Sequence, residues 1–252
     1  MFGCRPGNVL AGVQIHILSW VSHRFYTKEE LRLLYRHEWK HPVAPGDLFA
    51  LRARLGSVLQ RDAHTVDGRY QIRSLYFDNL RDKALREKLD GVEPREKYRL
   101  RCYNGDFSYI LLEKKKKVDG LCRKTQEVLT VPQTQALLAG VPLEEGGPLV
   151  QELGRKMTLY GLRPKTVVEY TREPFVYGPG NVRVTLDYGL RTGLFSTEFL
   201  RPGCPTVPVW DAPVILEVKW DEYLPDFVRC LVQVPGTRRT AFSKYAACRA
   251  YD

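Results

Sequence analysis

Five short stretches of the chain alternate between charged and apolar residues with a period of two. The clearest runs from Arg95 to Cys102, where every second residue is Arg or Lys. Successive side chains of a β-strand point to opposite faces, so the four cations of this stretch share one face. Cations at this spacing repel one another and need anionic partners if the face is buried. The pattern predicts a ligand with many negative charges, and a polyphosphate-like molecule fits it.

The same alternation, together with helical spacing and turn residues, predicts the other elements. Strands are expected at residues 34–40, 70–77, 95–103, 109–118, 166–172, 182–190 and 214–220. Helices are expected at residues 47–60, 80–89, 132–139, 148–160, 225–232 and 241–250. Asn104-Gly105-Asp106 predicts a tight hairpin, and Asp119-Gly120 predicts a second turn that leads into residues 121–124. His41-Pro42 is expected to stop the first strand, and Asp47 to cap the first helix.

Many antiparallel-type strands interleaved with short helices predict one α+β domain around a curved sheet or barrel. The charged strand faces would converge inward on a wet tunnel, while the apolar faces pack against helices outside. A solvated outer face is the ordinary explanation of one charged strand face, but five such strands favour the tunnel. The domain is expected at residues 34–252, after a poorly defined N-terminal extension at residues 1–33.

Composition narrows the class of partner. Lys and Arg number 39 against 29 Asp and Glu in 252 residues, a formal net charge of +10 that favours an acidic partner or a generic basic surface. The six cysteines include no C-x-x-C pair, which argues against a zinc site or a dense disulfide framework and favours reduced thiols in the cytoplasm. No stretch reaches the roughly 20 apolar residues of a membrane-spanning helix.

Four further stretches repeat the mixture of cations with sparse carboxylates: residues 36–40, 113–117, 183–187 and 217–219. Lys and Arg bind phosphoryl oxygens, Arg through a two-pronged fork and Lys as a point charge. Carboxylates can hold a divalent cation that bridges phosphates. Each stretch taken alone is better explained as a structural surface pair, but together they predict a phosphate site with a metal.

The sequence does not favour a histidine metal site, a glycine-rich phosphate loop or an activated serine. The five histidines show no metal-ligand spacing, and no G-x-x-x-x-G-K loop is present, so phosphate binding must use side chains. Ser243 beside Lys244 is better explained as a helix cap or a phosphate contact than as an activated nucleophile. Because Glu169 and Arg172 have opposite parity, we expect Arg172 to point inward and Glu169 to be structural. The role of Arg73 stays open.

Eight ordered motifs carry a family resemblance. They are Arg36-x-Glu38-x-Lys40, Ile72-Arg73-Ser74-Leu75-Tyr76-Phe77-Asp78-Asn79, Glu96-Lys97-Tyr98-Arg99-Leu100-Arg101, Leu112-Glu113-Lys114-Lys115, Tyr170-Thr171-Arg172, Arg183-Val184-Thr185-Leu186-Asp187, Leu216-Glu217-Val218-Lys219 and Ser243-Lys244-Tyr245. Over residues 35–249 the chain resembles the VTC domain, the polyphosphate polymerase branch of the triphosphate tunnel metalloenzymes.

The resemblance implies an eight-stranded antiparallel β-barrel whose tunnel binds triphosphate and Mn²⁺ or Mg²⁺. Family members of the yeast type move the γ-phosphate of ATP onto a growing polyphosphate chain. The implied phosphate ligands are Lys40, Arg99, Arg101, Lys115, Lys117, Lys124, Arg172, Arg183, Lys219 and Lys244, and the catalytic set within them is Lys40, Arg99, Arg101, Lys219 and Lys244. Glu217 would be the principal metal ligand, with Glu38 and Glu113 as helpers, and Asp187 would orient an Arg or support the metal.

Three alternatives stay open beside the polymerase. The same fold could use water as acceptor, which would make it a tripolyphosphatase or nucleoside triphosphatase, or it could bind polyanions without catalysis. A nucleic-acid-binding barrel is disfavoured, because the basic faces contain almost no interleaved aromatic residues. The expected partners are ATP or another nucleoside triphosphate, inorganic polyphosphate or triphosphate, and an unidentified membrane partner that could hold a cytoplasmic protein at a membrane.

Overall fold

The computed structural model describes residues 35–251, so the predicted extension at residues 1–33 lies outside the described part. Its strands are β1 (His37–Val43), β2 (Gln60–Arg61), β3 (Tyr70–Asp78), β4 (Arg95–Tyr103), β5 (Asp106–Val118), β6 (Leu121–Leu129), β7 (Arg163–Tyr177), β8 (Val182–Thr192), β9 (Val207–Pro208) and β10 (Val214–Trp220). Its helices are α2 (Asp47–Gly56), α3 (Lys83–Leu89), α4 (Val131–Leu138), α5 (Pro148–Tyr160), α6 (Asp226–Leu231) and α7 (Lys244–Cys248), with short 3₁₀ turns at Pro179–Asn181 and Arg249–Tyr251.

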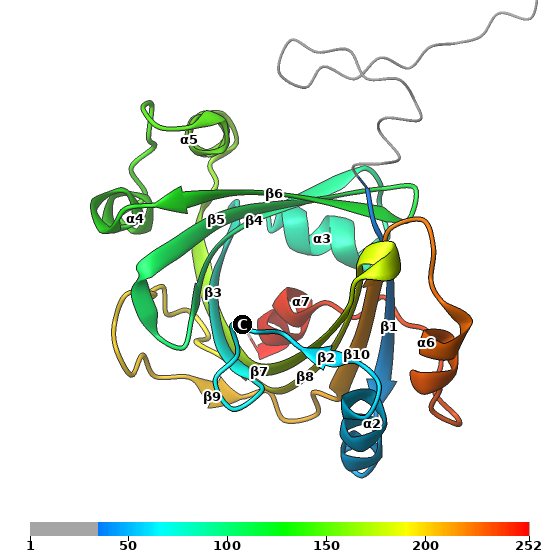
Figure 1. The fold of residues 1–252 in the computed structure, drawn as a ribbon. Helices are drawn as coiled ribbons and strands as arrows, with labels where there is room; N and C mark the ends of the chain where they lie inside the picture. The colour runs from blue at the N-terminus through cyan, green and yellow to red at the C-terminus, as the bar shows by residue number, and fades with distance from the viewer. Residues whose placement is uncertain (1–34, 252) are drawn as a thin grey trace, which may run out of the picture. The chain divides into compact units, whose positions relative to one another are not determined.

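Eight of these strands form one curled antiparallel sheet in the order β1-β10-β8-β7-β3-β4-β5-β6, with β2 added to β7 and β9 added to β8 (Figure 1). The two edges of the sheet meet at Arg36 and Cys122. The amide of Arg36 donates to the carbonyl of Cys122 over 2.9 Å, and the amide of Cys122 returns a bond of 3.1 Å to the Arg36 carbonyl. The predicted eight-stranded antiparallel barrel is therefore confirmed, and this pair of bonds closes its seam.

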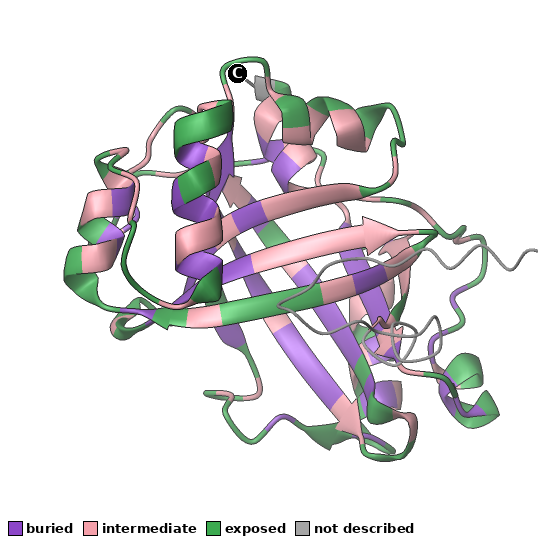
Figure 2. Cartoon of the chain, turned by 90° about the horizontal axis from the view of Figure 1, so that it is seen from above, coloured by how far each residue is buried: buried purple, intermediate pink, exposed green. Residues whose placement is uncertain are grey.

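Two apolar cores lie on the outer faces of the barrel, beneath helices. One joins β8 and β10 to α2 and α6, and it contains Leu186, Leu216 and Leu55, none of them exposed. The other joins β4 and β5 to α4 and α5, around Leu100 and Leu153. Figure 2 shows buried residues recurring along the strands that these helices cover. Each fully buried leucine contributes about 1.5–3 kcal/mol, so outward apolar faces drive this packing and leave the charged faces inside.

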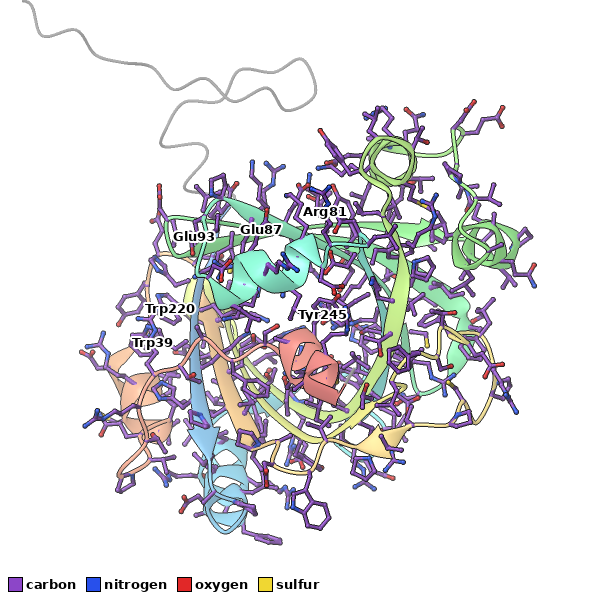
Figure 3. All side chains as sticks on the ribbon, turned by 180° about the vertical axis from the view of Figure 1, so that it is seen from behind. Trp39, Arg81, Glu87, Glu93, Trp220 and Tyr245 are labelled. Atoms are coloured by element: carbon purple, nitrogen blue, oxygen red, sulfur yellow. The ribbon has the colours of Figure 1, made fainter. Side chains whose placement is uncertain are left out.

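One helix departs from the expectation that helices pack outside. Helix α7 lies across one end of the barrel, next to α3, as the view from behind shows (Figure 3). Its Tyr245 and Cys248 are buried against Tyr76 and Tyr170 in a third apolar core, and the Tyr245 ring stacks on Tyr76 with ring centroids 4.9 Å apart. The helix therefore closes the barrel at that end with an aromatic layer.

Several strands and helices begin or end at residues other than those predicted. The first strand does not stop at His41-Pro42 but runs on to Val43. A proline is tolerated there because β1 is the sheet's edge strand, where an amide can be missing without breaking a ladder. Asp47 lies in the first turn of α2, which Gly46 precedes as the N-cap, so the predicted Asp47 cap is wrong. Strand β7 runs through 15 residues, about twice the predicted length, because residues before 166 and after 172 pair with β3, β2 and β8.

The two hairpin turns have the backbone that their sequences predict. Asn104 and Gly105 have φ of 52° and 70°, and Asp119 and Gly120 have φ of 48° and 77°. Two successive positive φ angles define the turn that matches the twist of antiparallel strands, and Asn-Gly and Asp-Gly favour it. These turns fix the register of β4, β5 and β6, and with it the faces of their lysines and arginines. None of the helices in residues 35–251 has the length and apolar character needed to cross a membrane.

Candidate functional site

The inward faces of the barrel strands bring most of the predicted charged residues into one tunnel. Strand pairing sets opposite one another Lys40 and Glu217, Glu38 and Lys219, Arg99 and Glu113, and Arg172 and Asp187. Because the side chains of paired residues lie on the same face, a cation meets a carboxylate at each of these positions. Lys244 joins the group from α7.

Glu38 and Glu217 form a pair of carboxyl groups at the β1–β10 ladder. Lys219 Nζ lies 3.0 Å from Glu217 Oε2 and 3.5 Å from Glu38 Oε1, while Lys40 Nζ lies 3.5 Å from Glu217 Oε1 and 3.8 Å from Glu38 Oε2. Lys115 Nζ adds a hydrogen bond of 2.7 Å to Glu38. Burial raises the pKa of both carboxyls, but the lysine charges outweigh burial and hold the pKa of Glu38 below, and that of Glu217 well below, the ordinary value.

Asp187 holds two cations on the β7–β8 side of the tunnel. The Arg172 guanidinium donates to both carboxylate oxygens of Asp187 over 2.6 and 2.7 Å and reaches Glu217 at 3.2 Å. Lys244 Nζ lies 2.6 Å from Asp187 Oδ2. Although burial raises the pKa of Asp187, Arg172 and Lys244 lower it to about 2. The carboxylate stays ionised, and it fixes one guanidinium and one ammonium group beside the Glu38–Glu217 pair.

Glu113 anchors a separate group of cations on β4, β5 and β6. Arg99 Nε donates to Glu113 Oε2 over 2.7 Å, Lys124 Nζ donates to Oε1 over 3.0 Å, and Arg101 lies 3.6 Å away. Burial raises the pKa of Glu113, but Arg101 and Arg99 bring it well below its ordinary value. The predicted metal ligands therefore divide: Glu38 and Glu217 come together, while Glu113 lies among arginines. Within residues 35–251 no group of three or more His, Cys, Asp or Glu side chains is placed to hold a metal ion.

Tyrosine hydroxyls also belong to the tunnel, and the pattern of charges did not single them out. Arg99 donates to the Tyr76 hydroxyl over 2.8 Å, and Arg101 donates to the Tyr170 hydroxyl over 3.1 Å. Burial raises the pKa of Tyr170, but the surrounding charges of Arg101 and Arg172 outweigh it and lower the pKa. Tyr76 therefore both packs on Tyr245 and orients a guanidinium.

Comparison with known proteins identifies the family. The model of the VTC domain family matches residues 35–251. The chain belongs to this family. A comparison with curated protein sequences gives no match.

Solved structures resemble this VTC domain. One is a Hippeastrum protein described as a putative adenylyl cyclase with a dominant triphosphatase activity, at 16% identity over 86% of this chain and 95% of that chain, with a TM-score of 0.51. Another is a putative adenylate cyclase from Bacillus halodurans, at 14% identity over 79% of this chain and 94% of that one, with a TM-score of 0.47. The likeness to the Hippeastrum protein shows a common fold.

Three predicted phosphate ligands of the VTC domain lie toward the ends of the tunnel or at its surface. Lys117 forms an ion pair of 2.7 Å with Glu93, outside the strands. Arg183 forms an ion pair of 2.9 Å with Asp62, and 44% of its side chain is exposed. Lys124 contacts Glu113, but 47% of its side chain is exposed. These cations flank the centre, which Lys40, Arg172, Lys219 and Lys244 surround.

Lys97 is an inward cation that the list of predicted ligands did not include. It pairs in register with Lys115, and its Nζ donates to Ser243 Oγ over 3.3 Å and lies 5.2 Å from the centre of the Tyr245 ring. Unlike the ten predicted phosphate ligands, it forms no ion pair with any carboxylate of residues 35–251. Burial, followed by the charge of Lys88, lowers the pKa of Lys97 to about 7. The sequence did carry a signal for Lys97, because the alternation of β4 places it on the same face as Arg99 and Arg101.

The contacts of Arg73, Glu169 and Ser243 define their structural roles. Arg73 points away from the tunnel and donates to Glu169 over 2.6 Å and to the carbonyl of Phe199 over 3.0 Å. Arg172 points inward and Glu169 outward, as their opposite parity predicts. Ser243 caps α7 by accepting a hydrogen bond from the amide of Ala246, so the capping interpretation holds for this serine.

Proposed function

We propose that this VTC domain is a metal-dependent phosphotransferase that moves the γ-phosphate of a nucleoside triphosphate onto a polyphosphate chain inside the tunnel. The observation that carries the proposal is the surplus of inward cations over inward carboxylates at the centre. The cations are Lys40, Arg99, Arg101, Lys115, Arg172, Lys219 and Lys244, and the carboxylates are Glu38, Glu113, Asp187 and Glu217. A triphosphate supplies the negative charge that such a site lacks.

The tunnel cations are held in place before substrate binds. Arg172 is fixed by two hydrogen bonds to Asp187, and Arg99 by Glu113 and Tyr76. Phosphoryl transfer spreads negative charge over the equatorial oxygens of the transferred group, and prepositioned donors stabilise that charge at little reorganisation cost. The acceptor phosphate is itself a nucleophile, so the reaction needs no protein base. Binding, alignment and charge neutralisation are therefore the work of these side chains.

Glu38 and Glu217 fit a divalent metal. They are two ionised carboxylates in contact with the same two lysines, and Mg²⁺ is commonly held by one or two carboxylates together with substrate phosphates. When bound, Mn²⁺ or Mg²⁺ would neutralise part of the charge of the phosphates. Lys40 and Lys219, which contact both carboxylates, would donate to phosphate oxygens.

Hydrolysis is the second candidate, with water as the acceptor in the same tunnel. It is favoured by the fold shared with the Hippeastrum protein, which is described as having a dominant triphosphatase activity. A polymerase needs room for a chain longer than a triphosphate. The inward row of β4 continues from Arg99 to Lys97 and Arg95, and Lys117 of β5 lies opposite Arg95, so these residues offer cations beyond the central group. That row favours the transferase.

The deciding experiment is a phosphate balance with ATP and Mn²⁺ or Mg²⁺. A transferase gives acid-precipitable chains that an exopolyphosphatase degrades, whereas a hydrolase gives orthophosphate or tripolyphosphate with no chains. Glu217→Gln should abolish either activity. Binding of tripolyphosphate without turnover under all metals, unchanged by Glu217→Gln, would instead identify a non-catalytic polyanion binder.

A further inference from the structure

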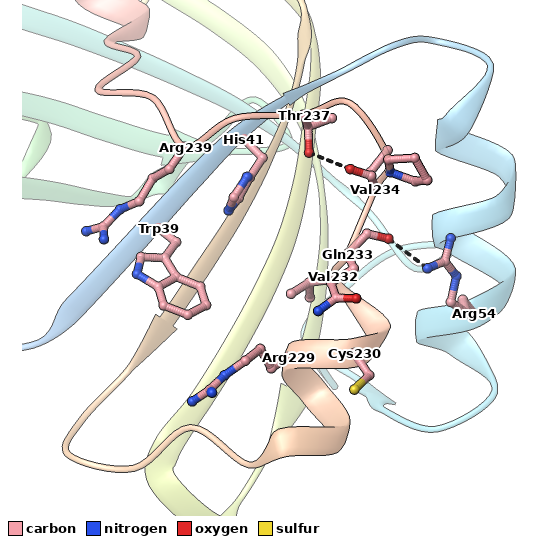
Figure 4. A pocket seen from close by; sticks show the side chains of 11 residues that line it. Trp39, His41, Arg54, Arg229, Cys230, Val232, Gln233, Val234, Thr237 and Arg239 are labelled. Carbon is pink, nitrogen blue, oxygen red and sulfur yellow. Dashed lines mark hydrogen bonds between the residues drawn. The ribbon is translucent and has the colours of Figure 1, made fainter.

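A cavity of about 710 Å³ lies on the outer side of β1, away from the tunnel. Its walls are the outward residues Trp39 and His41 of β1, Arg54 near the end of α2, Arg229 and Cys230 of α6, and, from the segment that follows α6, residues 232–235, 237 and 239 (Figure 4). Because Glu38 and Lys40 point into the tunnel, the alternation of β1 sends Trp39 and His41 to this opposite face. The two sites therefore share one strand but no side chain.

The lining of this outer groove is basic, with three arginines and no Asp or Glu. Arg54 donates to the carbonyl of Gln233 over 2.9 Å, and Arg239 lies 5.7 Å from the centre of the Trp39 ring. Arg229 has one ion pair, with Asp226 at 3.6 Å, in which both side chains are more than half exposed. Exposed pairs of this kind contribute little, so the positive charge of the groove is not balanced locally.

The arrangement of these groups is that of a small-molecule site. Cavities of about 300–1,000 Å³ accommodate drug-sized ligands, and guanidinium forks match phosphate oxygens. Trp39 gives the groove a rigid aromatic wall, because its ring packs edge-to-face on Trp220 with centroids 4.6 Å apart. We propose that this groove is a second anion-binding site, which holds a multiply phosphorylated small molecule through Arg229 and Arg239 independently of the tunnel.

The chain that lines the groove continues into the tunnel. After Arg239, the amide of Thr240 donates to the Lys40 carbonyl over 2.8 Å, and Lys40 Nζ donates to the Phe242 carbonyl over 3.3 Å. Ser243 and Lys244 follow at the start of α7. A ligand in the groove therefore binds the segment that carries a tunnel cation.

Cys230 provides a readout that the tunnel does not affect. It is the exposed cysteine of the described part of the chain, where Cys102, Cys122, Cys204 and Cys248 are buried. Its alkylation by iodoacetamide can be followed by peptide mass spectrometry with inorganic tripolyphosphate or ADP as the probe. At ten times the Kd, either probe should slow alkylation about ten-fold. The probe that protects at lower concentration identifies an inorganic or a nucleotide ligand.

Three variants separate the groove from the tunnel. The double variant Arg229→Gln/Arg239→Gln should abolish protection. For each variant, the rate of Cys230 alkylation with probe is compared with the rate without probe. Lys219→Met, which weakens the tunnel, should leave protection intact. Arg123→Gln with Arg155→Gln removes the same charge from residues outside the groove, and it should also leave protection intact. Protection absent from the unmodified protein, or undiminished in the Arg229 and Arg239 variant, would overturn the second site whatever the tunnel does.

Discussion

Glu38 and Glu217 lie on neighbouring strands and share the same two lysines, Lys40 and Lys219. Two carboxylates this close repel each other, and the lysine charges overcome both that repulsion and the cost of burial. The pair is therefore ionised at neutral pH. In the proposed function, Glu38 and Glu217 would hold the divalent cation, and Lys40 and Lys219 would bind phosphate oxygens of the substrate.

The first prediction concerns Glu217. Glu217→Gln keeps the size of the side chain but removes the charge that Lys219, Lys40 and Arg172 contact. We expect turnover of ATP to fall at least about 100-fold, because a preorganised electrostatic group at the reacting phosphate is lost. Steady-state kinetics with Mn²⁺ as the varied component measures the effect.

The matched control for Glu217→Gln is Glu169→Gln, a carboxylate of β7 that points outward to Arg73. It should retain activity within a few-fold. Equal losses in both variants would mean that the fold, rather than the tunnel charge, had been disturbed.

The second prediction concerns Asp187. Asp187→Asn leaves Lys244 buried without its carboxylate and leaves Arg172 with Glu217 as its remaining anionic partner. Removing one partner of a buried ion pair costs about 3–5 kcal/mol of unfolding free energy, since the remaining charge is uncompensated. We expect a lower Tm in thermal unfolding, and tripolyphosphate should raise it more than in the unmodified protein because the anion replaces the missing carboxylate.

Adding Lys244→Met to Asp187→Asn gives the control for that prediction. It removes the charge of Lys244 that Asp187→Asn leaves without a carboxylate. The double variant should therefore recover part of the lost Tm, and tripolyphosphate should stabilise it less than it stabilises Asp187→Asn. A double variant no more stable than Asp187→Asn would contradict the charge argument.

The third prediction follows from Lys97. Its pKa in the folded protein is about 7 against an ordinary value of 10.5, so between these values the unfolded chain binds more protons than the folded one. Stability therefore rises with pH from about 7 to 10.5. Lys97→Met removes this dependence: the variant should gain stability over the unmodified protein most clearly below pH 7, and the gain should vanish near pH 10.5. Urea unfolding across this range measures it.

Lys97 should also couple phosphate binding to proton uptake. An anion beside Lys97 favours the ammonium form, so tripolyphosphate should bind with uptake of a proton at pH 8 in the unmodified protein and without that contribution in Lys97→Met. Calorimetry in buffers of different ionisation enthalpy reports the number of protons. Identical uptake in both proteins would show that the ligand does not reach Lys97.

The sequence predicted the tunnel better than it predicted the contacts within it. Strict alternation in β4, and the Asn-Gly and Asp-Gly turns on either side of β5, determine which residues point inward, and both are local properties. Which carboxylate each cation contacts depends on strand order, which brings β1 beside β10 across almost the whole length of the chain. The family resemblance grouped Glu38, Glu113 and Glu217 as metal ligands by their short motifs, whereas the fold separates Glu113 from the other two.

Helix α7 shows a second limit of sequence pattern. Residues 241–250 predict a short amphipathic helix, and such a helix is expected to cover the outside of a sheet. Here the barrel interior offers Tyr76 and Tyr170 as an apolar surface at one end, and Tyr245 packs there. Tyr245 also donates to Asp78 over 2.9 Å, a contact between distant parts of the chain. That placement depends on the shape of the closed barrel.

The last prediction tests the separation of Glu113 from the metal pair. Glu113 contacts Arg99, Arg101 and Lys124, so Glu113→Gln should loosen these cations and lower kcat about 10- to 100-fold while the Mn²⁺ concentration for half-maximal rate stays within about two-fold. Glu38→Gln removes a carboxylate of the pair itself, and it should raise that Mn²⁺ concentration about 10- to 100-fold. A Mn²⁺ requirement that rises equally in both variants would place Glu113 at the metal, as its sequence motif first suggested. A rise in Glu38→Gln alone would assign metal binding to β1 and β10, and the positioning of arginines to β4 and β5.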